Sequence, residues 1–311
     1  MEKINNQGEE FSGSLRFDEP MFAHSTFKVG GKADAWVRPA KGIFPSYAAR
    51  LLKASKEEGI PVFVLGAGAN VVVSDQGFRG IVLDTGSWEG EEEPQEEGEG
   101  ALSVWVLSGT RIDNLVDKLA TQGLSGLEFL AGMPGSVGGA VWMNARCYDK
   151  SVSDALLETE ILNESFEREK IPFRAEDFSY KKSPFQQRRV LILSARFAVV
   201  ISESIDIRKE MEGHRRDRRD KGHYRFPSAG SAFKNNRDFM EPTGSIIDQL
   251  GLRGLSMGGA QVAPWHGNII INTGNATASD IRTLMGEVAR RVKEERGFDL
   301  ESEILFIGEW N

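Results

Sequence analysis

LEFLAGMPGSVGGAVWMNA, at Leu127–Ala145, sets four glycines, a proline and a serine among apolar residues. The glycines are Gly132, Gly135, Gly138 and Gly139, and because they lack side chains they let backbone N–H groups come close to a ligand. A series of bare amides near a helix start is one way in which proteins hold a diphosphate. A tight loop at a domain hinge is the alternative, and the glycines alone do not separate the two.

Length and composition indicate a globular protein of two domains. The chain has 311 residues, of which 40% are hydrophobic and 27% charged, and this length suffices for two cores. No apolar run reaches the roughly 18 residues that cross a bilayer, and the N-terminus lacks the pattern of a secretory signal. The single cysteine, Cys147, excludes an internal disulfide framework. We therefore expect a cytoplasmic protein without a membrane partner. The sequence does not give the oligomeric state, and a monomer is the default expectation.

Most of the net charge of −8 comes from one segment. Residues 89–99, EGEEEPQEEGE, hold seven acidic side chains and no basic one, and we expect a solvated loop tip there. The basic run at 215–219, RRDRR, is short, is interrupted by an aspartate and is typical of a solvated helix face. Because this basic run is short and the net charge of the chain is negative, we predict no nucleic-acid partner.

Strand, loop and helix alternate over the first half without a regular βαβ repeat, which favours an α+β fold. Apolar residues at helical spacing predict helices, and short apolar runs predict strands. Thr110 is the expected cap of one helix and Gly123 its end. The expected elements are a strand pair within 27–37, strands at 60–65 and 103–108, and helices at 46–58 and 110–120.

The second half is β-rich up to about residue 205, and charge then rises sharply. We predict a domain boundary at 205–225. The clearest helix is 280–296, which has one apolar face, Asp280 or Ser279 as its cap and Gly297 as its end. The other expected elements are strands at 190–193, 197–201, 259–263, 268–272 and 303–307, and a helix near 243–250.

GAGAN at 66–70 is a second glycine-rich loop. It follows a strand, but it lacks the third glycine and the helix of a dinucleotide fingerprint. It suits a turn that presents amides and the Asn70 side chain to a phosphate, and a plain β-turn is the alternative. Two such loops in one half of the chain could serve one ligand with a long diphosphate.

FPSAGSAFKN at 226–235 predicts a turn that holds Ser231 rigidly. No GxSxG context surrounds this serine, so a serine hydrolase is not favoured. A held serine can instead give a proton to carbon, while Lys234 and Asn235 could bind an anionic substrate. An ordinary loop serine remains the alternative.

Two glutamates near the C-terminus, Glu301 and Glu303, would face one side of a strand. The pattern indicates that at least one is functional or lies at a solvated edge, and it does not choose between them. No group of Cys, His, Asp or Glu has metal-ligand spacing, so we predict no metal site.

Seven segments together resemble the UDP-N-acetylenolpyruvoylglucosamine reductase (MurB) family, in the family's order. They span most of residues 25–309, and the lack of an extra tyrosine-loop insertion resembles the family's shorter type. The segments are STFKVGGKAD (25–34), VLGAGANVVVSDQGFRGIVL (64–83), GLEFLAGMPGSVGGAVWMNA (126–145), FSYKKSPF (178–185), FPSAGSAFKN (226–235), GLRGLSMGGAQVAPWHGNIIIN (251–272) and DLESEILFIGE (299–309).

The resemblance implies an α+β fold, with an FAD-binding domain of the vanillyl-alcohol-oxidase (PCMH) type and a smaller α/β substrate-binding domain. The implied division is a polar leader at 1–19, an FAD-binding region of two subdomains at 20–210, and a substrate-binding domain at 211–311 whose C-terminal strand completes the site. The implied reaction is the NADPH-dependent reduction of a nucleotide sugar, UDP-N-acetylglucosamine enolpyruvate, to UDP-N-acetylmuramate. That reaction serves peptidoglycan synthesis, and with it cell-wall biogenesis, cell shape and cell division.

The resemblance also assigns residues. Ser231 matches the family's serine that protonates carbon after hydride transfer from reduced FAD. Glu303 matches the carboxylate beside the substrate carboxylate, and it would act in protonated form because two ionised carboxylates repel. Tyr180 and Asn235 match substrate-binding positions, and Lys234 is a further candidate. The cofactor-binding residues that it implies for FAD are Leu65, Gly66, Ala67, Gly68, Ala69, Asn70, Val71, Pro134, Gly135, Ser136, Gly138, Gly139 and Ala140.

The chain departs from the family at three places. Lys181 replaces an arginine that polarises the enolpyruvyl carboxylate; it keeps the charge and loses the bidentate fork. We expect activity to survive with a weaker clamp, unless Lys182 or a nearby arginine substitutes. Ala69 replaces a serine of the phosphate turn. Arg146–Tyr148 replace small residues, and we hypothesise that Arg146 offsets the loss at Ala69.

Two other functions stay open. An FAD-dependent oxidoreductase of the same fold that acts on another substrate would have a covalent flavin tether, for which Cys147 is the nearest candidate. A catalytically weakened homologue would bind a nucleotide sugar and regulate wall synthesis. Lys181 is its only support, and the presence of Ser231 and Glu303 speaks against it.

Overall fold

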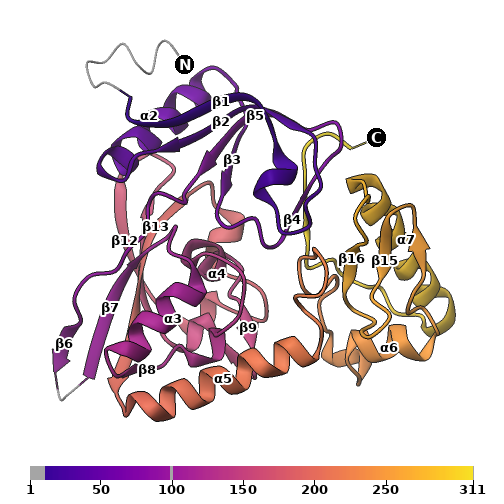
Figure 1. Ribbon diagram of the computed structural model, residues 1–311. Coiled ribbons are helices and arrows are strands. Elements are labelled where there is room, and N and C mark those ends of the chain that lie inside the picture. Colours follow the sequence, from indigo (N-terminus) through magenta and orange to yellow (C-terminus); the bar gives the residue numbers. More distant parts are fainter. Residues whose placement is uncertain (1–10, 99–100, 311) are drawn as a thin grey trace. The chain divides into compact units, whose positions relative to one another are not determined.

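The computed structural model describes residues 11–98 and 101–310, and Figure 1 labels its elements. The described chain forms two compact units, each built from separate stretches of sequence. The first unit holds residues up to 17, 35–67 and 80–215, and the second holds 18–34, 68–79 and 216 onward. The predicted functional regions, by contrast, are continuous, and their limits stay a prediction. Of the predicted leader at 1–19, residues 1–10 lie outside the described range, and Gly13–Pro20 forms strand β1.

A four-stranded sheet has the order β1–β2–β5–β3. Strands β3 and β5 run parallel, with Leu65 opposite Asp84. Helix α2, Phe44–Glu57, agrees with the predicted helix at 46–58 and buries Phe44 and Leu51 in the same core as these strands. The bounds of the other three strands are Lys32–Pro39 for β2, Val62–Leu65 for β3 and Phe78–Asp84 for β5.

The strand pair predicted within 27–37 is wrong. The stretch, which is described throughout, has one strand, β2, and its first residues form a loop. In this loop the N–H of Gly31 donates to the Ser74 carbonyl oxygen at 2.8 Å. A Cβ at Gly31 would lie 2.2 Å from the Asp75 carbonyl oxygen, so the loop requires glycine there.

An antiparallel sheet of the first unit has the order β12–β11–β13–β7–β6, and β8 pairs with β13. Strands predicted at 190–193 and 197–201 are in fact one, β13, because the ladder with β7 continues between them: Ser194 pairs with Leu107 and Arg196 with Trp105. The bounds are Arg168–Pro172 for β12, Leu156–Leu162 for β11, Leu191–Ile201 for β13, Ala101–Leu107 for β7, Gln95–Gly98 for β6 and Leu124–Ser125 for β8.

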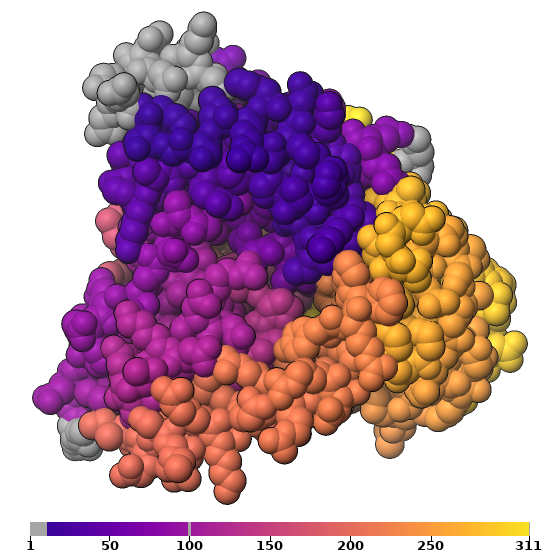
Figure 2. Space-filling model, in the orientation of Figure 1, coloured from indigo at the N-terminus to yellow at the C-terminus, as the bar shows by residue number. Residues whose placement is uncertain are grey.

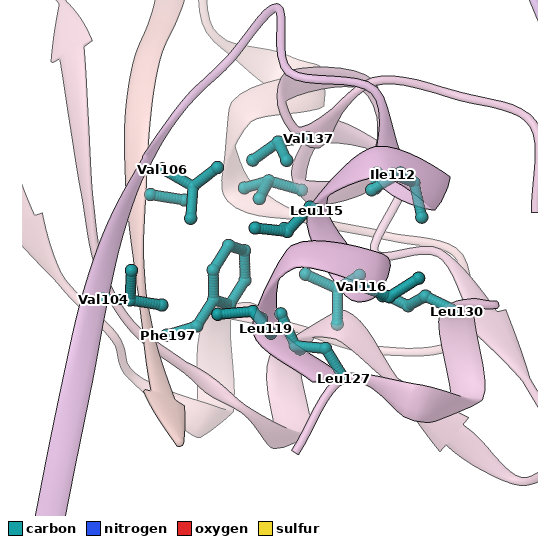
Figure 3. Packing of buried hydrophobic residues seen from close by; sticks show 14 of the residues in the cluster. Val104, Val106, Ile112, Leu115, Val116, Leu119, Leu127, Leu130, Val137 and Phe197 are labelled. Carbon is teal, nitrogen blue, oxygen red and sulfur yellow. The ribbon is translucent and has the colours of Figure 1, made fainter. Parts of the chain in front are cut away.

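Helices α3, Ile112–Thr121, and α4, Val137–Trp142, share a buried core with this sheet. Figure 3 shows Leu115 and Leu119 of α3 pointing toward Val106 and Phe197 of the strands. Thr110 does not cap α3 as predicted. Its hydroxyl instead bonds with the main chain of Gly90, at 2.9 and 3.1 Å.

The acidic segment is not a loop tip, as far as its described residues 89–98 show. It includes the edge strand β6, which is exposed along its length and pairs with β7. One of its carboxylates, Glu97, forms an ion pair with Arg196 at 2.7 Å. Because an edge strand has one hydrogen-bonding side open, a row of acidic side chains suits it by discouraging pairing with another chain.

Helix α5, Ser204–Asp220, carries the charge-rich segment at which we predicted a boundary, and the two units divide after Arg215 on it. Figure 2 shows this helix, in salmon, running along the molecular surface. Only Ile207 and Met211 of α5 are buried. No helix in the described ranges is long and apolar enough to cross a membrane.

The second unit contains a three-stranded sheet, β14–β15–β16, beside helices α6 and α7. Thr277 caps α7 and forms a capping box with Asp280, so the cap lies two residues before the predicted Ser279. Gly297, with φ of 74°, ends the helix as predicted. The bounds are Ser256–Met257, Ala260–Val262 and Ile270–Asn272 for β14 to β16, Thr243–Gln249 for α6 and Ala278–Arg296 for α7.

Strand β17, Leu305–Ile307, lies parallel to β4, Val71–Val73, and Leu305 pairs with Val71. The Asp75 carboxylate accepts the N–H groups of Ala278 and Ser279, each at 2.8 Å. These contacts attach the stretch 68–79 to the C-terminal part of the second unit. The short 3₁₀ helices are Met21–His24, Lys41–Ile43, Glu128–Leu130, Val152–Asp154, Ala175–Asp177, Pro184–Gln187 and Arg237–Phe239.

Candidate cofactor and active site

The start of α4 lies in the glycine-rich segment, with Ser136 as its N-cap. The sequence suggests that the backbone N–H groups of this segment are free, but three of them have acceptors within the protein. The N–H of Val137 donates to Thr110 at 3.0 Å and that of Gly138 to Ser108 at 2.8 Å. The N–H of Gly139 donates to the Ser136 hydroxyl at 3.4 Å. The expectation that Gly138 and Gly139 offer free N–H donors is therefore wrong.

Close packing explains Gly138 instead. A Cβ at this position would lie 2.8 Å from the Cβ of Ser108. The Ser108 hydroxyl is buried and has no hydrogen-bond partner among the described residues. Sequence reasoning missed Ser108, because nothing in its local pattern distinguishes it from a strand serine.

The second glycine loop meets the first within the first unit. A Cβ at Gly66 would lie 2.2 Å from the Ser136 hydroxyl oxygen, so a side chain at this position would require that hydroxyl to rotate away. No described residue accepts the N–H of Gly66, Ala67, Gly135 or Ser136. Free amides, the glycine that Ser136 approaches closely and the unpartnered Ser108 hydroxyl together suit the phosphates of a cofactor such as FAD.

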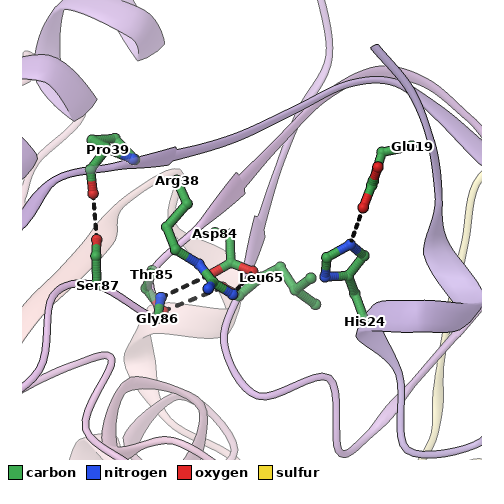
Figure 4. A network of polar contacts seen from close by, with 9 residues as sticks. All are labelled: Glu19, His24, Arg38, Pro39, Leu65, Asp84, Thr85, Gly86 and Ser87. Atoms are coloured by element: carbon green, nitrogen blue, oxygen red, sulfur yellow. Dashed lines mark hydrogen bonds and ion pairs between the residues drawn. The ribbon is translucent and has the colours of Figure 1, made fainter. Parts of the chain in front are cut away.

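Strand β3 brings the chain to this loop, and its end is held firmly. The Leu65 carbonyl oxygen accepts both the N–H and the hydroxyl of Thr85, at 2.9 and 3.2 Å. Asp84 binds Arg38 and the N–H of Gly86, at 2.9 and 2.7 Å (Figure 4). The loop therefore starts from a fixed point.

The remaining predicted cofactor residues differ in exposure. Leu65, Val71 and Ala140 have buried side chains, so these residues can reach a ligand only through the main chain. Pro134 and Gly139 are exposed. In the second unit, the stretch Gly68–Asn70 packs on the segment at 24–26: the Gly68 carbonyl oxygen accepts the Thr26 N–H at 3.0 Å, and the φ of Gly68 is 65°. Ala69 is half-buried there.

Tyr180 and Lys181 form a tight turn that is fastened to the end of α4. The turn closes by two hydrogen bonds between Ser179 and Lys182, at 3.2 and 3.0 Å, and Lys181 has a left-handed φ of 56°. The Asn144 amide donates to the Ser179 carbonyl oxygen at 2.9 Å. Ser183 and Gln186 both donate to the carbonyl oxygen of Trp142, at 2.6 and 2.9 Å. One helix thus joins the glycine loop at its start to the Lys181 turn at its end.

In the second unit, Ser231 and Glu303 lie on adjacent segments. Ser231 is in a β-bridge with Ile269, and Phe233 is in another with Ser302. The N–H of Glu303 donates to the carbonyl oxygen of Ala232, the residue after Ser231, at 2.9 Å. The structure therefore brings together two residues that are 72 positions apart in the sequence.

The other predicted substrate residues have partners within the protein. Lys234 forms an ion pair with Glu301 at 2.5 Å. The Asn235 side-chain oxygen accepts the N–H of Thr243 at 2.9 Å, at the start of α6. Since Glu301 pairs with Lys234 while the main chain of Glu303 bonds beside Ser231, Glu303 is the better placed of the two glutamates.

Arg146, which we hypothesised to contact FAD, binds within its own hairpin. Its guanidinium contacts Ser151 and Asp149, each at 3.3 Å. Strands β9, Arg146–Cys147, and β10, Lys150–Ser151, form this hairpin. At its tip the Tyr148 ring stacks on His214 of α5, with ring centroids 3.9 Å apart.

Two histidines of the second unit, His223 and His266, have their ring centroids 6.4 Å apart. Burial lowers the pKa of His223 to about 4, and the nearby charges of Arg218 and Lys221 act in the same direction. Burial also lowers the pKa of His266. Both rings are therefore neutral at pH 7. Among the described residues no group of three or more His, Cys, Asp or Glu could hold a metal ion.

Comparisons with known proteins agree with these features. Residues 222–307 match the family model for the UDP-N-acetylenolpyruvoylglucosamine reductase C-terminal domain, and residues 46–165 match an FAD binding domain. The chain is 41% identical to the UDP-N-acetylenolpyruvoylglucosamine reductase of Treponema denticola, over 96% of this chain and 95% of that protein. It is 39% identical to the reductase of Borreliella burgdorferi, over 92% of each.

A solved structure is also similar. The crystal structure of UDP-N-acetylenolpyruvylglucosamine reductase (MurB) from Thermus caldophilus matches with a TM-score of 0.76 and 30% identity, over 96% of this chain and 100% of that one. The predicted α+β fold with an FAD-binding domain is confirmed.

Proposed function

The chain belongs to the UDP-N-acetylenolpyruvoylglucosamine reductase family, and on this premise we propose that it is an FAD-dependent oxidoreductase that reduces UDP-N-acetylglucosamine enolpyruvate to UDP-N-acetylmuramate with NADPH. The observation that carries the proposal is the hydrogen bond from the Glu303 N–H to the Ala232 carbonyl oxygen, 2.9 Å long. This bond supports the proposal, because it joins the segments that carry Glu303 and Ser231, and an acid–carboxylate pair requires such neighbouring segments. The reaction would serve peptidoglycan synthesis in the cytoplasm.

Bound FAD supplies the hydride that adds to the enolpyruvyl double bond, after its reduction by NADPH. The N–H groups of Gly66, Ala67, Gly135 and Ser136 would hold its phosphates, since no described residue accepts them. The Ser108 hydroxyl, buried and unpartnered among the described residues, is available to the same group. Glycine at position 66 keeps this approach open.

Ser231 would deliver a proton to the substrate carbon next to the carbon that receives hydride. A serine hydroxyl is a weak acid, so the donor must be aimed, and the charge that remains on its oxygen must be stabilised. The bridge to Ile269 fixes the main chain at Ser231. This rigidity supports a role as proton donor.

Glu303 would donate a hydrogen bond to the substrate carboxylate, where enolate charge develops. This donation would require a proton on the Glu303 carboxyl, because two ionised carboxylates in contact repel. Lys181 would supply a positive charge to the same carboxylate. As a lysine it acts as a point charge, without the two parallel hydrogen bonds of an arginine.

A spectroscopic experiment tests the proposal. The protein is purified, its visible spectrum is recorded, NADPH is added without oxygen, and UDP-N-acetylglucosamine enolpyruvate follows. We expect a yellow protein that bleaches with NADPH and regains its colour with the enolpyruvyl substrate. Bleaching without that return would favour an oxidoreductase with another substrate. A colourless protein that binds the nucleotide sugar would favour a regulatory homologue.

A further inference from the structure

The side chain of Asn70, in the GAGAN loop, bonds to the main chain of Glu303. Its amide nitrogen Nδ2 donates to the Glu303 carbonyl oxygen at 2.9 Å. In return, the N–H of Leu305 donates to the Asn70 carbonyl oxygen at 3.0 Å. The parallel pairing of β4 and β17 begins one residue further on, where Val71 pairs with Leu305. The side chain of Asn70 thus adds one hydrogen bond, to the Glu303 carbonyl oxygen, next to the main-chain ladder of β4 and β17.

Glu303 is held from both sides. Its N–H bonds to Ala232, beside Ser231, and its carbonyl oxygen accepts the Asn70 amide. The main chain sets the direction of the Cα–Cβ bond, so these two bonds fix the point from which the Glu303 side chain extends. One of them originates from the loop that we expected to contact a phosphate.

We infer that Asn70 is a positioning residue for Glu303: it aligns the carboxyl group with the Ser231 hydroxyl and ties both to the GAGAN loop. This rests on the proposed function, because it gives Glu303 a substrate to bind. One N–H of the Asn70 amide is committed to Glu303, so in this inference the loop asparagine acts on the chemistry through the protein, in place of the phosphate contact that the resemblance implied. A catalytic group displaced by about 1 Å can lose ~100-fold in rate, so we expect loss of this bond to slow turnover.

Two substitutions separate this role from cofactor binding. Asn70→Ala removes the donor, and Asn70→Asp keeps the shape but places a carboxylate oxygen against the Glu303 carbonyl oxygen, where the two repel. The main-chain ladder of β4 and β17 is unchanged in both. We expect FAD content and the rate of flavin reduction by NADPH within about threefold of the original. Reoxidation by UDP-N-acetylglucosamine enolpyruvate should slow by about 30- to 100-fold.

Thr26→Val is the matched control. The Thr26 hydroxyl bonds to the carbonyl oxygens of Gly68 and Ala69, each at 3.4 Å, so it supports the same loop from another segment without contacting Glu303. We expect both half-reactions of this variant to stay within about threefold. The dissociation constant of the nucleotide sugar, measured by calorimetry, and the pH profile of reoxidation should change in the Asn70 variants alone.

Three results would overturn the inference. If the Asn70 variants lose FAD and both half-reactions slow together, Asn70 is a cofactor ligand. If reoxidation, substrate affinity and pH profile match the original, the bond has no positioning role. If Thr26→Val gives the same selective loss, the effect belongs to the loop as a whole. Should Asn70→Ala fail to fold, Asn70→Asp decides. Failure of the unmodified protein to turn over the enolpyruvyl substrate would instead refute the proposed function.

Discussion

Arg215 and Asp113 form an ion pair at 2.6 Å in which the carboxylate oxygen Oδ1 also accepts the N–H of Gly132, at 2.9 Å. One atom of α3 therefore connects α5 with the glycine-rich segment. Arg215 also binds Asp117 at 2.9 Å. The hydrogen bonds that Arg215 donates to the Asp117 and Asp113 carboxylates raise its pKa, against the opposing effect of burial, so this guanidinium stays charged.

Arg215→Gln tests this connection. We expect a loss of about 1 kcal/mol, because partly exposed ion pairs contribute about that much, and a fall in Tm of about 2–4 °C. FAD should dissociate more readily, since Asp113 then holds Gly132 without its counter-charge. Thermal unfolding and flavin release on dilution measure the two effects. Lys209→Gln, on the exposed side of the same helix, is the control, and equal losses in both variants would contradict the connection.

Ser231→Ala should separate the two half-reactions. We expect flavin reduction by NADPH to stay near its original rate, and reoxidation by the enolpyruvyl substrate to fall by about 100-fold or more, because a positioned proton donor contributes ~10²–10⁴. Stopped-flow absorbance follows both steps. Ser256→Ala, at an exposed serine, should change neither, and an equal fall of both steps in Ser231→Ala would make the serine structural.

Lys181→Met and Lys181→Arg test the charge beside the substrate carboxylate. We expect Lys181→Met to lower kcat/KM by about 30-fold or more. Lys181→Arg should equal or exceed the original, because it restores a bidentate donor. Both variants keep a side chain at the left-handed φ of 56°, so the turn is equally strained. Steady-state kinetics with varied nucleotide sugar is the measurement, and an unchanged kcat/KM in Lys181→Met would exclude the role.

Acid should destabilise the second unit through His223. Its pKa in the folded state is about 4, below the ordinary value of about 6.5, so the unfolded chain binds more protons between these values. The contribution of the neutral His223 ring to the free energy of unfolding is fully present above about pH 6.5. It is lost as the pH falls toward 4. The groups around it are His266, Arg218, Lys221 and Asp217.

His223→Gln should flatten this decline. Urea unfolding at a series of pH values from 7 to 4 measures it, with a full effect of at most about 3 kcal/mol. His214→Gln, in the first unit, serves as control. A decline of unchanged slope in His223→Gln would assign the acid sensitivity to other groups.

Gly138→Ala should damage the cofactor site by crowding. The new Cβ would lie 2.8 Å from the Ser108 Cβ, and overpacking of this kind costs about 1–3 kcal/mol. We expect reduced flavin content, read from the ratio of visible to ultraviolet absorbance. Adding Ser108→Gly to this variant should restore part of the flavin content, because it removes the Ser108 Cβ that the new Cβ would meet.

Gly213→Ala supplies the comparison. Its Cβ would meet nothing within 4 Å, and alanine favours a helix interior by about 1 kcal/mol over glycine. The flavin content of Gly213→Ala should stay unchanged, and its free energy of unfolding should rise slightly. Normal flavin content in Gly138→Ala would refute the crowding argument.

The sequence determined the elements whose signals are local. Helix α7 follows from apolar residues at helical spacing and from Gly297, because these depend on neighbours three or four positions apart. The order of the motifs was enough to predict the family, FAD and the residues Ser231 and Glu303. Local signals failed at β13, where two apolar runs joined into one strand, because a neighbouring strand supplied the pairing.

Only the tertiary structure decided which partner each polar group takes. The Gly138 N–H bonds to Ser108, Lys234 pairs with Glu301, and Asn70 reaches a residue 233 positions away. A backbone amide bonds to whichever acceptor folding brings near, and nothing in its own neighbours records that choice. The glycines of the opening segment were recognisable from the sequence, but only the fold showed that some of their amides are already used.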